Sequence, residues 1–177
     1  VYLEGYLLSS DNGFYNCLQA QSMARSAGTY VALTLSDPFM VATFKERFVQ
    51  LVENGVDVLF CNEDEANTFT DSSDSTQAIQ RLGQRTSLVC ITRGANGVLI
   101  GQDGHSVSVS AVPVEAVDTN GAGDLFAGGF LYGINHALDV EQAGKIGSYA
   151  AAQVVAQYGP RLQKTLDSVE TILAQFE

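Results

Sequence analysis

The most informative stretch of the sequence is VDTNGAGDLFAGGF, residues 117–130. Three small residues, Gly121, Ala122 and Gly123, stand where a loop is expected to turn into a helix. Small residues let backbone N–H groups approach an anion closely, and the helix dipole favours negative charge at the same end. The stretch therefore predicts a helix start that suits a phosphate group.

Asp124 follows at once, in the first turn of the expected helix. Its carboxylate would lie beside the anion site, where it suits a base that takes a proton from an attacking hydroxyl. A glycine-rich helix start with an acidic residue favoured by the dipole explains these residues equally well.

Two other phosphate-binding motifs are excluded by the sequence. A Walker A loop needs Gly-Lys-Ser/Thr, and a dinucleotide fingerprint needs Gly or Ala where Phe126 stands.

Outward from this stretch, apolar runs alternate with helical patterns along the chain. Their spacing predicts strands at 1–8, 30–35, 56–61 and 88–92, a hairpin of 98–100 with 107–109, and helices at 15–28, 38–54, 64–69, 75–83, 123–136, 140–158 and 167–176. Such alternation is typical of an α/β fold with a mainly parallel, doubly wound sheet and helices on both faces. No linker interrupts it, so residues 1–177 are expected to form a single domain.

Composition limits the classes of partner. The chain has 177 residues, 46% of them hydrophobic, which is enough for one globular domain with its own core. Its net charge of −11 and the lack of a basic stripe make nucleic acid and anionic membranes poor partners. No apolar run approaches a membrane span, and no signal peptide is evident. The chain opens at Val1 without Met, which is expected of a piece of a longer protein.

The three cysteines, Cys17, Cys61 and Cys90, form no CxxC pair and have no His near them in the sequence. A disulfide scaffold or a structural zinc site is therefore not expected. Reduced thiols fit a cytoplasmic protein, and Cys90, inside an apolar run, is expected to fill the core.

Four further segments of the sequence are also informative, and so is the order in which they occur. They are LSDPF at 35–39, FCNEDEA at 60–66, ITRGANGV at 91–98 and GSYAAAQVVAQYGPR at 147–161. Together with residues 117–130, they resemble the motifs of the ribokinase-like (PfkB) carbohydrate and nucleoside kinases, and most of all the adenosine-kinase-like members. The resemblance covers nearly the whole chain, and motifs in the correct order are far more specific than any one of them.

The resemblance implies roles for the most prominent residues. Asp124 would be the catalytic base, and the backbone of residues 121–123 would form an anion hole. Asn62 and Glu65 would hold Mg²⁺, largely through water, and orient the phosphates of ATP; Mg²⁺ keeps several waters and needs few protein carboxylates. Without the resemblance, Asn62 and Glu65 are equally well explained as a capped helix start.

The resemblance also implies a nucleotide site and a cation site. Thr92, Arg93 and Gly94 would border the nucleotide, although Arg93 by itself reads as a solvated loop residue. Gly147 and Ser148 stand near the expected adenine position, where family members often carry Asn or another polar residue, so the sequence departs from the pattern there. The positions that match a monovalent cation site, for an ion such as K⁺, are Asp118, the backbone of Asn120 and the loop at Gly159.

Members of this family are roughly twice as long as this chain. The resemblance therefore implies the C-terminal, nucleotide-binding half of an ATP-dependent kinase that phosphorylates a primary hydroxyl. Adenosine is the favoured acceptor, with a sugar such as ribose or fructose next. This half alone is expected to transfer phosphate poorly, and an exposed sheet edge predicts self-association, for instance as a homodimer. The alternatives are a non-catalytic nucleotide-binding module and, more weakly, a purely structural domain.

Overall fold

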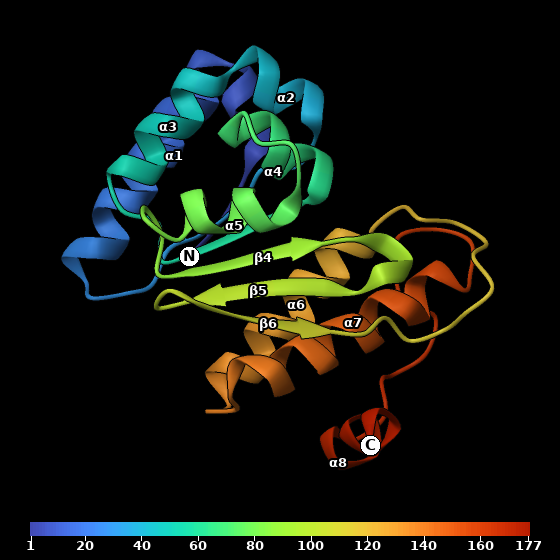
Figure 1. Ribbon diagram of the computed structural model, residues 1–177. Coiled ribbons are helices and arrows are strands. Elements are labelled where there is room, and N and C mark those ends of the chain that lie inside the picture. Colours follow the sequence, from blue (N-terminus) through green and yellow to red (C-terminus); the bar gives the residue numbers. More distant parts are fainter. The chain divides into compact units, whose positions relative to one another are not determined.

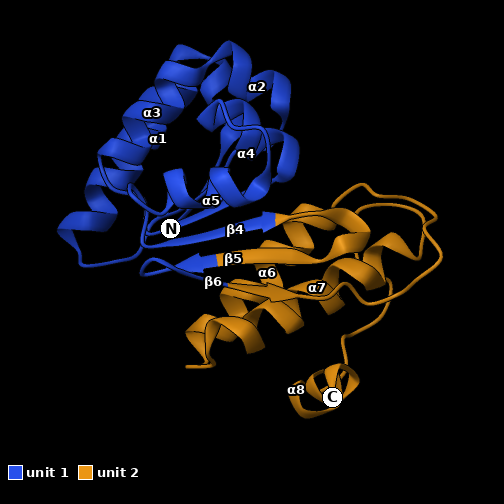
Figure 2. Cartoon of the chain, viewed as in Figure 1, with its two compact units in different colours: residues 1–91, 101–106 blue, residues 92–100, 107–177 orange.

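The computed structural model describes residues 1–177. Their contacts divide them into two compact units, which Figure 2 colours separately. The first unit holds residues 1–91 and 101–106, and the second holds residues 92–100 and 107–177. Six strands form one sheet in the order β1-β2-β3-β4-β5-β6. The α/β class is as predicted, whereas a single domain over residues 1–177 stays a prediction.

The first unit consists of parallel strands and the helices that connect them (Figure 1). β1 pairs with β2 and β2 with β3, both in parallel, in a register that aligns the buried residues Leu3, Leu33 and Leu59. Its elements are β1 (Tyr2–Glu4), the 3-10 helix η1 (Gly5–Ser9), α1 (Asp11–Ser26), β2 (Ala32–Thr34), α2 (Pro38–Thr43), α3 (Lys45–Glu53), β3 (Val58–Asn62), α4 (Glu63–Thr70), α5 (Ser75–Leu82) and β4 (Leu88–Thr92), whose last residue counts with the second unit.

The first predicted strand is much shorter than residues 1–8. The chain leaves the strand after Glu4 and turns into η1 at Gly5, which lies so close to the backbone of β2 that a Cβ there would be 2.7 Å from the carbonyl oxygen of Thr34. The following helix begins at residue 11, four residues before the predicted start at residue 15. Ser10 caps it, its hydroxyl accepting a hydrogen bond from the N–H of Gly13 at 3.1 Å.

The helix predicted over residues 38–54 is two helices. Phe44 lies between α2 and α3 with φ −117° and ψ 28°, outside the helical range. The break lets Arg47 of α3 lie over the rings of Phe14 and Phe44 and donate a hydrogen bond to the carbonyl oxygen of Leu8 at 2.8 Å. Phe14 and Leu8 lie more than thirty positions from Arg47 in the sequence, so no local pattern predicts these two contacts.

The second unit holds a pair of helices and a C-terminal segment that packs on one of them. Its elements are η2 (Gly94–Asn96), α6 (Ala122–Asn135), α7 (Val140–Val155), α8 (Val169–Leu173) and η3 (Ala174–Phe176), while β5 (Val98–Gln102) and β6 (His105–Val109) contribute residues to both units. Figure 1 shows β5 and β6 running in opposite directions, so the sheet is mixed. The predicted hairpin turn is confirmed: Asp103 and Gly104 both have positive φ, 51° and 78°.

Glycines let α6 and α7 approach each other closely. A Cβ at Gly129 would lie 3.0 Å from the Cα of Gly147, and a Cβ at Gly133 would lie 2.8 Å from the Cα of Ala143. At the other end of the unit, Ile172 of α8 packs with Ile146 and Tyr149 of α7. α6 therefore packs closely on α7 through its middle and its C-terminal part.

The three cysteines are free and buried, as predicted. Burial raises the pKa of the Cys61 and Cys90 thiols well above their usual range, so both stay protonated core residues. None of the helices has the length and apolar character that crossing a membrane requires.

Candidate active site

The start of α6 has the geometry that its glycines predicted. Gly121 is the N-cap residue with φ +80°, a left-handed conformation that glycine adopts readily. The backbone of Pro160 packs on it, since a Cβ at Gly121 would lie 2.8 Å from the carbonyl oxygen of Pro160. The first turn of an α-helix leaves N–H groups without partners in the helix. Here they belong to Ala122, Gly123 and Asp124, and the N–H of Ala122 donates to the carbonyl oxygen of Thr119 at 3.2 Å.

Space is open beside this first turn. A Cβ built on Gly123 would meet no atom within 4 Å, and Asp124, the next residue, is exposed. An anion could therefore approach the N–H groups at Gly123 without meeting a side chain, with a carboxylate one residue away. This arrangement can bind a phosphoryl group and accept a proton next to it.

Asp118 ties the loop before α6 to the loop after α7. One carboxylate oxygen accepts a hydrogen bond from the N–H of Asn120 and the other from the N–H of Gly159, both at 3.0 Å. These two hydrogen bonds hold the pKa of Asp118 below its usual range. The structure thus brings together the three positions predicted for a monovalent cation.

Side chains alone do not make a metal site in this protein, because no group of three or more His, Cys, Asp or Glu residues is placed to hold an ion. Near Asp118, backbone oxygens would have to supply the remaining ligands of a monovalent cation. Such oxygen-only surroundings are compatible with a hard cation. The cation site stays a prediction.

Asn62 and Glu65 form a reciprocal cap at the start of α4, directly after β3. The side-chain oxygen of Asn62 accepts from the N–H of Glu65 at 2.8 Å, and Oε2 of Glu65 accepts from the N–H of Asn62 at 3.0 Å. Asn62 Nδ2 also donates to Oε1 of Glu65 at 2.6 Å. The capped helix start considered from the sequence is thus present. Each carboxylate oxygen keeps a second lone pair, so an outer-sphere role toward Mg²⁺ remains compatible with the cap.

Glu65 is only 5% exposed. Burial raises its pKa from 4.5 to about 7, the hydrogen bond from the Asn62 backbone opposes this, and the charges of Asp37 and Asp64 add to it. The Glu65 carboxyl group is therefore partly protonated near neutral pH. A cation bound beside it would favour the charged form, and the carboxyl group would then lose its proton.

The raised pKa makes stability depend on pH. The folded protein binds the Glu65 proton more tightly than the unfolded chain, so the free energy of unfolding falls as pH rises from 4.5 to about 7. We expect this fall to be about 2–3 kcal/mol and to be absent in Glu65→Gln. Urea unfolding of both proteins between pH 4.5 and 8 measures it. If the free energy of unfolding varied with pH in the same way in both proteins, Glu65 would have an ordinary pKa.

Arg93, between β4 and β5, does not extend into solvent, because its side chain bonds to residues of the neighbouring turn and of β6. Its Nη2 donates to the hydroxyl of Ser108 at 2.7 Å and to the carbonyl oxygen of Asn96 at 3.3 Å, while its backbone N–H donates to the carbonyl oxygen of Gly97 at 2.7 Å. Arg93 therefore shapes the turn at Gly94 that follows Thr92, the last residue of β4. The contact of these residues with a nucleotide stays a prediction.

Gly147 and Ser148 are both buried in α7. A Cβ at Gly147 would lie 2.8 Å from the carbonyl oxygen of Phe126 in α6, which explains why the larger Asn does not stand there. The structure thus gives Gly147 a packing role, and the predicted contact with adenine is left untested.

The first unit adds polar groups that sequence reasoning missed. Glu4 ends β1, and Ser36 follows β2 with φ +69°, an unusual value for a residue other than glycine. The hydroxyl of Ser36 donates to Oε2 of Glu4 at 3.5 Å, and the hydroxyl of Tyr6 donates to the carbonyl oxygen of Ser36 at 3.3 Å. Like Asn62, these residues lie at the carboxyl ends of neighbouring parallel strands, where ligands bind in open α/β sheets. That rule was the signal that could have found them.

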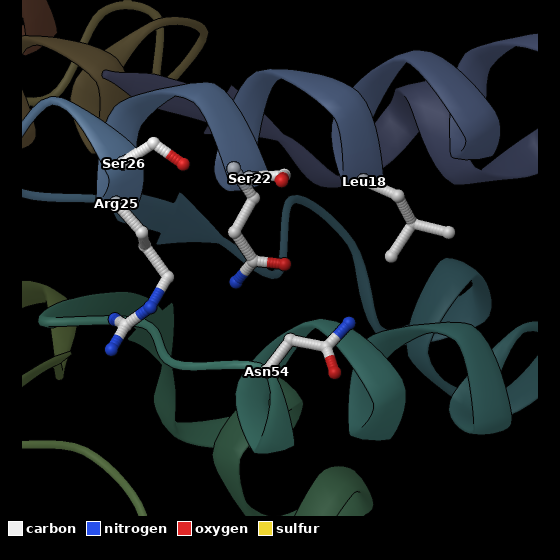
Figure 3. A pocket seen from close by; sticks show the side chains of 6 residues that line it. Leu18, Ser22, Arg25, Ser26 and Asn54 are labelled. Carbon is white, nitrogen blue, oxygen red and sulfur yellow. The ribbon is translucent and has the colours of Figure 1, made fainter.

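A pocket of about 350 Å³ lies at the opposite, amino edge of these strands. Figure 3 shows Ser22, Arg25 and Ser26 on α1, with the Arg25 side chain extending away from the helix, and Asn54, which follows α3, on the other side of the pocket. The other lining residues are Leu18 and Gln21. None of the predicted site residues lines this pocket, so we do not assign it to the candidate site.

Asn62 and Glu65 belong to the first unit, and the other predicted residues belong to the second. Within the second unit, the structure gathers residues 118–124 and the loop at Gly159 around the start of α6. Arg93 and Gly147 each have structural contacts of their own, as described above.

Comparison with known proteins identifies the family of this chain. The model of the pfkB family carbohydrate kinases matches residues 1–166. Adenosine kinase 1 of Arabidopsis thaliana is 29% identical over 175 residues, which cover 89% of this chain and 49% of that protein. The chain therefore spans about half the length of this curated relative.

Solved structures show the same fold. A probable sugar kinase from Rhizobium etli superposes with a TM-score of 0.90 at 35% identity, over 98% of this chain and 52% of that one. The adenosine kinase of Sinorhizobium meliloti superposes with a TM-score of 0.89, also at 35% identity, over 98% of this chain and 53% of that one. Both neighbours are kinases of small molecules by name.

Proposed function

The chain belongs to the pfkB family of carbohydrate kinases, and from that premise we propose that it is the nucleotide-binding half of an ATP-dependent kinase. The full-length protein would transfer the γ-phosphoryl group of ATP to a primary hydroxyl of a nucleoside or sugar. The observation that carries the proposal is the start of α6, where open space at Gly123 adjoins the exposed carboxylate of Asp124.

The proposed reaction is a direct displacement at phosphorus. Asp124 accepts the proton of the acceptor hydroxyl as that oxygen forms a bond to the γ-phosphorus. The bond from the γ-phosphorus to the β,γ-bridging oxygen breaks, and ADP leaves with the electron pair. N–H groups of residues 121–123 stabilise the charge of the transferring group.

Mg²⁺, when bound with ATP, would neutralise part of the phosphate charge. Asn62 and Glu65 are the residues proposed to orient it through water. Their oxygens fit that task because all of them are already held in place by the reciprocal cap. K⁺ or another monovalent cation would be held at Asp118, Asn120 and Gly159, next to the anion hole.

A nucleoside is the favoured acceptor because aromatic side chains are exposed at the carboxyl ends of β1 and β2. Tyr6 is 56% exposed and Phe39 is 72% exposed. Both flank the strained Ser36, one through a hydrogen bond and the other three residues along the chain. Aromatic side chains that are more than half exposed suit stacking on a nucleobase, which a sugar acceptor lacks. The names of two similar proteins, both adenosine kinases, support adenosine.

Phe39→Ala in the full-length protein is expected to raise KM for adenosine about ten-fold, since one stacking contact contributes about 1–3 kcal/mol. KM for ATP should not change. Tyr30→Ala is the matched control, because Tyr30 is 76% exposed and precedes β2 at the amino edge. Steady-state kinetics measure both. Equal KM values in the two variants would argue for a sugar acceptor instead.

Equilibrium binding tests the proposal as a whole. Calorimetric titration of the full-length protein with Mg²⁺ and a non-hydrolysable ATP analogue should give saturable binding to one site. A purely structural domain would give no binding at all.

A further inference from the structure

The loop that follows α7, residues 157–163, supports the start of α6. The N–H of Gly159 donates to the Asp118 carboxylate at 3.0 Å, and the backbone of Pro160 packs on Gly121. Gly121 is the residue whose left-handed conformation starts α6. The position of the anion-binding N–H groups therefore depends on this loop.

One side chain closes the loop. The carboxamide of Gln157 donates from Nε2 to the carbonyl oxygen of Arg161 at 2.5 Å and accepts at Oε1 from the N–H of Gln163 at 3.3 Å. Both of its polar atoms are thus used within the loop, and the side chain is half-buried. The loop has no helical or extended structure of its own (Figure 1), so these two hydrogen bonds are what join its beginning to its end.

We propose that Gln157 is a positioning residue for phosphoryl transfer, which orders residues 157–163 and through them fixes the anion hole at Gly121. This inference rests on the proposed kinase function. Gly159 has φ +88°, and glycine adopts positive and negative φ about equally readily, so its own backbone preference does not hold this conformation. Without the Gln157 carboxamide, its N–H is no longer held toward Asp118. If the start of α6 is displaced, the rate of phosphoryl transfer falls, because the transfer requires the N–H groups and the reacting groups to be aligned.

The test compares Gln157→Met with Gln163→Met in the full-length protein. Both variants replace a glutamine by a side chain of similar length in the same loop. Only the first removes the two hydrogen bonds, because Gln163 takes part through its backbone N–H. Amide hydrogen exchange at Gly159 should become about ten-fold faster or more in Gln157→Met and stay unchanged in Gln163→Met.

Kinetics supply the second readout. We expect kcat to fall roughly ten-fold in Gln157→Met with KM for the acceptor unchanged, and the unfolding temperature to match that of Gln163→Met. Unchanged exchange at Gly159, equal effects of the two substitutions, or faster exchange with an unchanged kcat would overturn the inference. Absence of transfer in the unmodified protein would overturn the proposed function instead, and the exchange comparison would still decide whether Gln157 orders the loop.

Discussion

Asp124→Asn in the full-length protein is expected to lower kcat about a hundred-fold or more, because the amide cannot accept the proton of the attacking hydroxyl. The side chain keeps its size and its place in the first turn of α6. Affinity for the ATP analogue should therefore change by no more than a few-fold. Steady-state kinetics and calorimetric titration separate the two effects.

Glu141→Gln is the matched control for this substitution. It also removes a carboxylate from the first turn of a long helix, in this case α7. Glu141 pairs only with Lys145, one turn away, and a surface pair of this kind contributes little to stability. If kcat fell only a few-fold in Asp124→Asn, Asp124 would be a helix-start charge. The non-catalytic nucleotide-binding module would then be the better account.

Gly123→Val is expected to weaken binding of Mg²⁺ and the ATP analogue about ten-fold or more, since its branched side chain would fill the space that the phosphate needs. A Cβ at Gly123 meets no protein atom within 4 Å, so the substitution causes no clash of its own. Loss of affinity can then be attributed to exclusion of the anion. Calorimetry measures this effect directly.

Gly128→Val provides the control on the same helix. Gly128 also lies in α6, and a Cβ there likewise meets nothing within 4 Å. Both substitutions place the same β-branched residue in one helix, with similar costs in helix propensity. Equal affinities of the two variants would mean that no phosphate binds at residues 121–123.

The elements that sequence could predict are those fixed by local chemistry. The start of a helix at residues 121–123 and its acidic first turn follow from residues 117–130, and the hairpin follows from Asp103-Gly104. The reciprocal cap of Asn62 and Glu65 was foreseen as an alternative, and the structure shows it. Each of these features joins residues no more than a few positions apart, which is why short patterns reveal them.

Features that depend on distant residues were missed or misjudged. The end of β1 at Glu4 accompanies the close approach of Gly5 to the backbone of β2, and the break at Phe44 accompanies the contacts of Arg47 with Phe14 and Leu8. Likewise, the close approach of α6 explains why residue 147 is glycine. No pattern in the sequence predicts the two hydrogen bonds by which Gln157 joins the ends of its loop. Tertiary packing decides such positions.

The most direct test of the central claim is to follow the labelled γ-phosphate of ATP in the full-length protein with a panel of nucleosides and sugars. The account predicts Mg²⁺-dependent appearance of label on a primary hydroxyl, fastest with adenosine, and its loss in Asp124→Asn. A folded protein that binds the ATP analogue but labels no acceptor would contradict it.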